Sequence, residues 1–177
     1  MVGCDPIKDE GCCSCNSKKV LVEYLYLDLK TCDRCIGTDA VLEEVLKEIG
    51  PALLCAGYDV EFEKKEISSR EIAAEYRFLS SPAIRVNGMD ICESVAENSC
   101  GCCSDISGTD VECRVFEFEG EDYEVPPKEM LATSILRAVF APKEECSCGN
   151  YSMPENIIAF FDGKEKKSKC SCGSDCC

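Results

Sequence analysis

The sequence predicts one α/β domain in which helices cover a mixed central sheet. Three observations predict this class: strand-like and helix-like segments alternate, the first strand is apolar on both faces, and two later strands meet at a tight turn, Asn87-Gly88. The chain has 177 residues, of which 45% are apolar and 30% charged. This composition supplies enough apolar surface for the core of one domain of ordinary size.

The first half of the domain alternates strands and helices. Residues 20–29 are apolar, β-branched and aromatic, and they predict a strand buried on both faces. Apolar residues recur at helical spacing over 41–49, and Gly50-Pro51 predicts a kink or the end of that helix. Residues 58–62 alternate apolar with acidic side chains and predict a second strand. The capping box Ser68-Ser69-Arg70-Glu71 then begins another helix.

Two hairpins and a helix complete the predicted domain. The first hairpin turns at Asn87-Gly88, a dipeptide typical of tight two-residue turns, and the second turns at Gly120. Pro126-Pro127 begins the helix, which ends before Pro142. The predicted strands of the hairpins cover residues 83–86 and 89–92, then 112–119 and 122–125.

The composition excludes several classes of function. The chain has no histidine, which removes imidazole metal sites, His-ligated haem, and Ser-His-Asp or Cys-His catalysis. A net charge of −15 argues against binding to nucleic acid or to anionic membrane surfaces. No signal peptide is evident and no apolar run is long enough to insert into a membrane, so we expect a cytoplasmic protein. Its 18 cysteines should then be reduced, and clusters of reduced cysteines indicate soft-metal binding or redox chemistry.

Two motifs carry a resemblance to a known fold. Cys32-Asp33-Arg34-Cys35 directly follows the first strand, and Ser81-Pro82 begins another strand roughly fifty residues later. This order resembles the three-layer thioredoxin fold, and looks closest to the glutaredoxin-like group and to an uncharacterised prokaryotic family of thioredoxin-like domains. The resemblance covers residues 20–140 and implies that Pro82 follows a cis peptide bond and lies against the active-site sulfurs. The Asp-Arg dipeptide and the segment 95–125 depart from the minimal fold.

The resemblance implies thiol–disulfide chemistry at Cys32 and Cys35. A thiol at a helix N-terminus is stabilised as thiolate, and a cysteine three residues later can resolve a mixed disulfide with a protein or a small thiol. We expect Arg34 to support the Cys32 thiolate and Asp33 to oppose it. The alternative is a structural CxxC pair that only packs. Cys55 and Cys92 lie on apolar patterns and are predicted to be buried small hydrophobes.

A second group of cysteines follows the fourth strand. In the thioredoxin-like topology this segment returns to the active-site end, which would place Cys100, Cys102 and Cys103 near Cys32, and Cys113 could join them. Four converging thiolates would suit zinc or, less well, an iron–sulfur cluster, and adjacent cysteines suit a trigonal thiophilic ion such as As(III). A disulfide relay to the CxxC pair and an inert loop are the other interpretations.

The cysteines also divide the chain into a tail of residues 1–18, a thioredoxin-like domain of residues 19–141 and a tail of residues 142–177. The spacing in the tails resembles metallothionein stretches, and vicinal pairs near both ends are similar to arsenic metallochaperones. Residues 157–161 are too apolar to stay in solvent, and we expect them to dock on the core. The tail cysteines predicted as metal ligands are Cys12, Cys13, Cys15, Cys146, Cys148, Cys170, Cys172, Cys176 and Cys177.

Three functions are therefore compatible with the sequence. The first is a thiol–disulfide oxidoreductase whose additional cysteines bind an ion or relay electrons. The second is a non-enzymatic chaperone or buffer for a soft metal or metalloid, which would pass its ion to a metal-transport partner. The third, an iron–sulfur electron carrier, is less favoured because the spacing of Cys100, Cys102, Cys103 and Cys113 matches no standard ferredoxin pattern.

Overall fold

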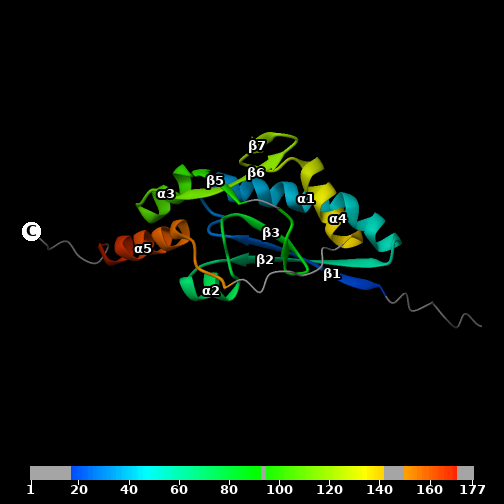
Figure 1. Ribbon diagram of the computed structural model, residues 1–177, viewed down its shortest axis with the longest axis horizontal. Helices are drawn as coiled ribbons and strands as arrows, with labels where there is room; N and C mark the ends of the chain where they lie inside the picture. Colours follow the sequence, from blue (N-terminus) through cyan, green and yellow to red (C-terminus); the bar gives the residue numbers. More distant parts are fainter. Residues whose placement is uncertain (1–16, 93–94, 142–149, 171–177) are drawn as a thin grey trace, which may run out of the picture.

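The computed structural model describes residues 17–92, 95–141 and 150–170 (Figure 1). They form an α/β structure around a four-stranded mixed sheet with the strand order β2-β1-β3-β4. The central strand β1 runs parallel to β2 and antiparallel to β3, and β3 forms a hairpin with β4. The strands are β1 (Lys18–Tyr26), β2 (Tyr58–Glu66), β3 (Ala83–Val86) and β4 (Met89–Asp90). This architecture confirms the predicted fold class and is consistent with a thioredoxin-like α/β fold.

Two long helices, α1 (Asp33–Cys55) and α4 (Lys128–Phe140), pack on one face of the sheet. Alternate residues of β1 point to this face, so that Val20, Val22 and Tyr24 are buried against it. The helices contribute Leu42 and Leu131 to the same apolar cluster, among other residues. This cluster packs against the middle and the C-terminal part of α1, whereas the N-terminus of α1 lies in a second apolar cluster.

The second apolar cluster lies around the N-terminus of α1 and includes several cysteines. Leu25 and Leu27, from the end of β1 and the loop after it, belong to this cluster together with residues of α2 (Arg70–Glu75) and α5 (Glu155–Cys170). Figure 1 shows α2 and α5 on the side of the sheet away from α1 and α4. Ile157 and Phe160 of α5 are buried in this cluster, which confirms that residues 157–161 dock on the core.

The segment inserted before α4 contains more structure than the sequence predicts. The predicted second hairpin is present as β6 (Glu112–Phe118) and β7 (Glu121–Tyr123), joined at Glu119-Gly120 with left-handed backbone angles at both residues. An additional strand, β5 (Ala96–Ser99), pairs with β6, and the segment around Cys102 forms a short helix, α3 (Gly101–Ser107). The segment is therefore not a loop, and hydrogen bonds from Cys100 N–H to the carbonyl oxygen of Val111 and from Val111 N–H to Ser104 Oγ connect the start and the middle of α3 to the chain that follows it.

The end of α1 and the burial of two cysteines were the next local predictions. Of the two outcomes predicted at Gly50-Pro51, the helix does not end there but continues to Cys55, since Leu53 is fully buried and glycine before proline removes the Cβ that would clash with the ring. Cys55 is exposed at the end of this helix, and Cys92 is half-buried, so neither is a fully buried core residue. Among the described residues, no helix is long and apolar enough to cross a membrane.

Candidate functional site

The first cysteine of the CxxC motif is held at the start of α1 by the loop that follows β1. Asp28 Oδ1 accepts hydrogen bonds from the backbone N–H groups of Lys30, Thr31 and Cys32, at 2.8, 2.6 and 3.3 Å. Cys32 is the N-cap residue of α1, with extended backbone angles and no side-chain capping bond. Its sulfur is therefore not used to cap the helix, and it is fully buried.

The second cysteine of the motif lies beside the predicted proline loop. The peptide bond between Ser81 and Pro82 is cis, as the resemblance implied, and Ser81 Oγ lies 3.5 Å from Cys35 Sγ. Tyr24 donates a hydrogen bond of 2.7 Å to the carbonyl oxygen of Cys35. A hydrogen bond from the Cys32 thiol lowers the pKa of Cys35 to about 7 against the effect of burial, and Ser81 adds to this lowering. Ser81 is a site residue that the sequence prediction missed, although its position before Pro82 could have indicated it.

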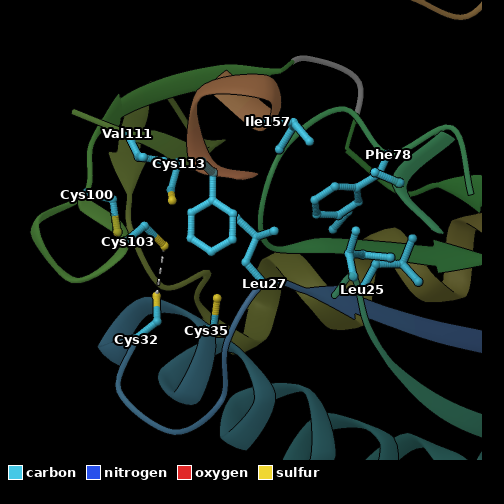
Figure 2. Packing of buried hydrophobic residues seen from close by; sticks show 14 of the residues in the cluster. Leu25, Leu27, Cys32, Cys35, Phe78, Cys100, Cys103, Val111, Cys113 and Ile157 are labelled. Carbon is cyan, nitrogen blue, oxygen red and sulfur yellow. Dashed lines mark hydrogen bonds between the residues drawn. The ribbon is translucent and has the colours of Figure 1, made fainter. Parts of the chain in front are cut away.

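Three cysteine sulfurs from two elements converge on one point. The Sγ atoms of Cys32, Cys100 and Cys103 all lie within 4.8 Å of one another, and the Cys32–Cys103 distance is 3.8 Å (Figure 2). All three side chains are buried, with exposed fractions of 0%, 4% and 0%. Cys100 is the N-cap residue of α3 and Cys103 lies in its first turn. The predicted approach of the second cysteine group to Cys32 is confirmed for these two residues.

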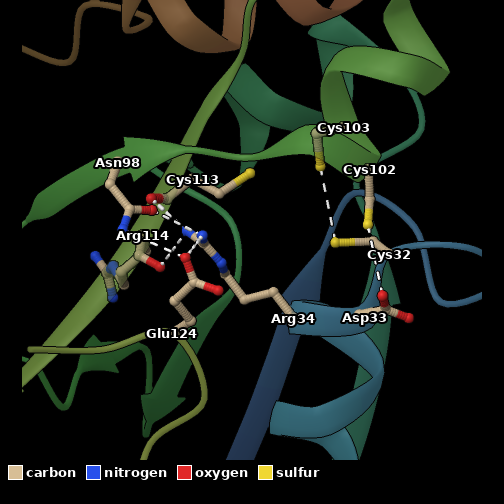
Figure 3. Close-up of polar contacts among 9 residues, drawn as sticks. All are labelled: Cys32, Asp33, Arg34, Asn98, Cys102, Cys103, Cys113, Arg114 and Glu124. Atoms are coloured by element: carbon tan, nitrogen blue, oxygen red, sulfur yellow. Dashed lines mark hydrogen bonds and ion pairs between the residues drawn. The ribbon is translucent and has the colours of Figure 1, made fainter.

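The two remaining cysteines of the second group lie at the margin of this set. Cys113, on β6, is buried in the same apolar cluster as Cys100 and Cys103, but it does not lie within the 4.8 Å set. Cys102 is half-exposed and its sulfur lies 3.9 Å from Asp33 Oδ2 (Figure 3). Adjacent Cys102 and Cys103 therefore point to different neighbours. We name Cys32, Cys100 and Cys103 the sulfur triad.

The buried thiols share protons unequally. Hydrogen bonds from Cys103, Cys113 and Cys32 lower the pKa of Cys100, so its sulfur is the first of the triad to ionise. The same bonds to Cys100 raise the pKa of Cys32 and of Cys103, which keep their protons, and burial adds to the increase. The pKa of Cys113 is raised for the same reason. Neighbouring buried thiolates repel each other, so an ion that binds three thiolates must displace protons from the triad.

Apolar side chains enclose the triad. The cluster that contains the cysteines also contains Leu27, Val111 and Phe78, together with Ile157 and Phe160 of α5 (Figure 2). Helix α5 is fixed over α3 by a hydrogen bond of 3.2 Å from Thr109 Oγ1 to the carbonyl oxygen of Ala159. Sequence reasoning predicted that this segment docks, but gave no indication that it covers the cysteines. The cover excludes water from the sulfurs.

Arg34 does not support the Cys32 thiolate as expected. Its side chain is 5% exposed, and the guanidinium turns toward the inserted sheet, away from Cys32 (Figure 3). There it donates hydrogen bonds to the carbonyl oxygens of Cys113 and Arg114, at 2.8 and 3.0 Å, and pairs with Glu124 at 2.6 Å. The prediction was wrong because the two terminal nitrogens of this buried guanidinium bind acceptors on the inserted segment, while Nε has no partner among the described residues. Arg34 therefore connects α1 to β6, the two elements that carry Cys32 and Cys113.

The remaining predicted ligands belong to the two tails. Every cysteine side chain that the structure describes is a free thiol, in the set Cys32, Cys35, Cys55, Cys92, Cys100, Cys102, Cys103 and Cys113. Cys12, Cys13, Cys15, Cys146, Cys148, Cys172, Cys176 and Cys177 lie outside the described residues, as does the side chain of Cys170.

Comparison with known proteins adds a family and no function. The family model described as "Domain of unknown function (DUF2703)" matches residues 20–135, which include both cysteine groups of the site. No curated protein matches the chain, and no solved structure matches it.

Proposed function

The chain belongs to the DUF2703 family, and from the arrangement of its sulfurs we propose that it binds a soft metal or metalloid ion through the thiolates of Cys32, Cys100 and Cys103. The observation that carries the proposal is the convergence of these three buried sulfurs within 4.8 Å. Thiolates are the ligands that thiophilic ions prefer in proteins. The ion is the cargo of the protein, and a metal-transport partner would receive it.

The sulfur separations fit a single ion. Two thiolates on one tetrahedral ion, with bonds of about 2.3 Å, lie about 3.8 Å apart, and in a trigonal plane about 4.0 Å apart. The Cys32–Cys103 distance is 3.8 Å, and no distance in the triad exceeds 4.8 Å. An ion can therefore be held with sulfur movements of about 1 Å or less. An iron–sulfur cluster of several metal atoms needs more room, so the spacing favours one ion.

Charge indicates which ions the site favours. Three thiolates carry three negative charges, and uncompensated charge is costly in an apolar interior. A trivalent metalloid such as As(III) gives a neutral complex, whereas Zn(II) or Cd(II) leaves one negative charge and Cu(I) leaves two. Arg34, the buried cation within the CxxC motif, is already paired with Glu124 and does not offset that excess. We therefore propose As(III) as the ion held most tightly, with the divalent ions weaker.

Equilibrium titration tests this function directly. The full-length chain is used with serine at the ten cysteine positions outside residues 19–141, so that the tails bind no ion. We expect one As(III) per chain, and weaker binding of Cd(II), Zn(II) and Cu(I). The variant Cys103→Ser removes a triad sulfur and should abolish tight binding, while Cys55→Ser, at an exposed cysteine, should not. Millimolar affinity for all four ions would refute the proposal.

Thiol–disulfide exchange in the cytoplasm is the second candidate. It is favoured by the position of Cys32 at the N-terminus of α1 and by the lowered pKa of Cys35 beside the cis-Pro82 loop. Its substrate would be a protein disulfide or a mixed disulfide of a small thiol. The complete burial of Cys32 makes it the weaker candidate, because a substrate sulfur must reach the nucleophile. Reduction of insulin or of a glutathione mixed disulfide tests it, and activity unchanged in Cys32→Ser would reject it.

A further inference from the structure

Cys35 contacts the sulfur triad without belonging to it. It follows Cys32 by three residues at the start of α1, and both side chains are buried in the same apolar cluster (Figure 2). Among the described residues, the sulfurs close enough to share one ion are those of Cys32, Cys100 and Cys103. When the triad holds an ion, Cys35 is therefore a buried thiol next to a ligand, and Ser81 Oγ lies 3.5 Å from its sulfur.

We propose that Cys35 makes the bound ion oxidation-labile: hydrogen peroxide oxidises Cys35, and Cys32 then leaves the ion to form the Cys32–Cys35 disulfide. This inference rests on the proposed function and adds its regulation. One sulfur cannot supply a thiolate to an ion and also take part in a disulfide. Disulfide formation therefore leaves only Cys100 and Cys103 on the ion, which is then released.

The step balances with the peroxide as the only oxidant. The Cys35 thiolate attacks one peroxide oxygen, the O–O bond breaks, and sulfenic acid and hydroxide form. The Cys32 sulfur then attacks the Cys35 sulfur, the S–O bond breaks, and a second hydroxide leaves as the bond from Cys32 to the ion breaks. The two sulfurs together lose two electrons and the peroxide gains two. The hydroxides take up protons to become two water molecules.

The surroundings favour a small oxidant and this particular pair of sulfurs. Cys32 and Cys35 are both fully buried under an apolar cover that includes Phe160, so a bulky disulfide reaches them less readily than a peroxide does. Ligation makes the triad sulfurs less nucleophilic, which leaves Cys35 as the free buried thiol of the CxxC pair. Residues three apart on a helix lie about 5–6 Å apart at Cβ, and a small rotation brings their sulfurs together.

The test uses the full-length chain with serine at the ten tail cysteine positions, loaded with Cd(II) and then treated with hydrogen peroxide. A colorimetric chelator measures released Cd(II), and mass spectrometry of proteolytic peptides locates the disulfide. In the parent protein we expect release in step with a Cys32–Cys35 disulfide, and rebinding after reduction with a dithiol. Cys35→Ser should bind Cd(II) as tightly as the parent and release it at least about tenfold more slowly. Cys55→Ser, on the same helix, should release it at the parental rate.

The outcomes separate this inference from the function on which it rests. If the parent protein binds no Cd(II), the proposed ion binding fails and this inference fails with it. If the parent binds Cd(II) but Cys35→Ser releases it at the parental rate, only the inference is overturned. A disulfide that joins Cys32 to a residue other than Cys35 also overturns it. Loss of Cd(II) binding in both Cys35→Ser and Cys35→Ala would make Cys35 a ligand, which again contradicts the inference.

Discussion

Replacing Gly163 with alanine tests how closely α5 covers the sulfur triad. A Cβ atom at this position would lie 2.5 Å from the carbonyl oxygen of Ser107 and 2.9 Å from side-chain atoms of Thr109. Ser107 is the last residue of α3 and Thr109 follows it closely, so a Cβ atom at residue 163 forces α5 away from α3. Overpacking of this kind costs about 1–3 kcal/mol. Alanine regains about 1 kcal/mol of helix propensity, which leaves a net loss of roughly 0–2 kcal/mol.

Thermal unfolding of the ion-free protein measures this loss. A net loss of about 1 kcal/mol corresponds to a fall of about 2–4 °C in the midpoint for a chain of this size. Lys166→Ala is the control, because it lies on the same helix and its side chain is exposed. The affinity for Cd(II) should fall in Gly163→Ala, since α3 carries Cys103, and remain unchanged in Lys166→Ala. Equal midpoints and affinities in the two variants would refute the close contact between α5 and α3.

Three further predictions concern the site and its support. Cys103→Ser should weaken Cd(II) binding more than Cys113→Ser does, because Cys113 lies outside the triad. Residues that contact the ligands rather than the ion typically contribute about 10–100-fold to affinity. A larger effect of Cys113→Ser in titrations would contradict the assignment. The affinity for the ion should rise with pH, because two triad thiols with raised pKa values must lose their protons, so that binding releases about two protons per ion. Calorimetry in buffers of different ionisation enthalpy counts these protons, and a count of zero would contradict the assignment. Arg34→Met should destabilise the fold by about 2–4 kcal/mol, because two buried carbonyl oxygens lose their donors. Lys19→Met, at an exposed ion pair, is the control and should leave the denaturation midpoint unchanged. Equal midpoints in the two variants would contradict a stabilising role of the Arg34 hydrogen bonds.

The sequence predicted the main elements because their signals are local. The apolar run at β1 and the Asn87-Gly88 turn specify their structures within a few residues, and both are present. The helix cap at residues 68–71 was predicted one residue too early, since Ser69 rather than Ser68 accepts the hydrogen bond from Ile72 N–H. Two serines in succession offer the same chemistry, and only the backbone angles select between them.

The site could be predicted only in outline, because its contacts are not local. The thioredoxin-like topology predicted that the second cysteine group approaches Cys32. It could not predict that Cys103 rather than the adjacent Cys102 faces the CxxC pair, because this depends on the helical turn of α3. That helix has a glycine and two cysteines in its first turn, residues with weak helix propensity, and it is stabilised by contacts made elsewhere in the chain. The role of Arg34 was missed for a related reason: its acceptors lie on β6, about eighty residues away.

The sulfur triad joins residues that are far apart in the chain, and this has a consequence for the order of events during synthesis. Cys32 and Cys103 are separated by 71 residues, and Arg34 and Cys113 by 79. A ribosome-bound chain therefore has a complete CxxC pair long before it has a second triad sulfur. Contacts over such separations form late, because loop closure must precede them. Ion uptake by the triad should thus report that the inserted segment has docked, and we expect a newly made chain to bind an ion only once it has folded.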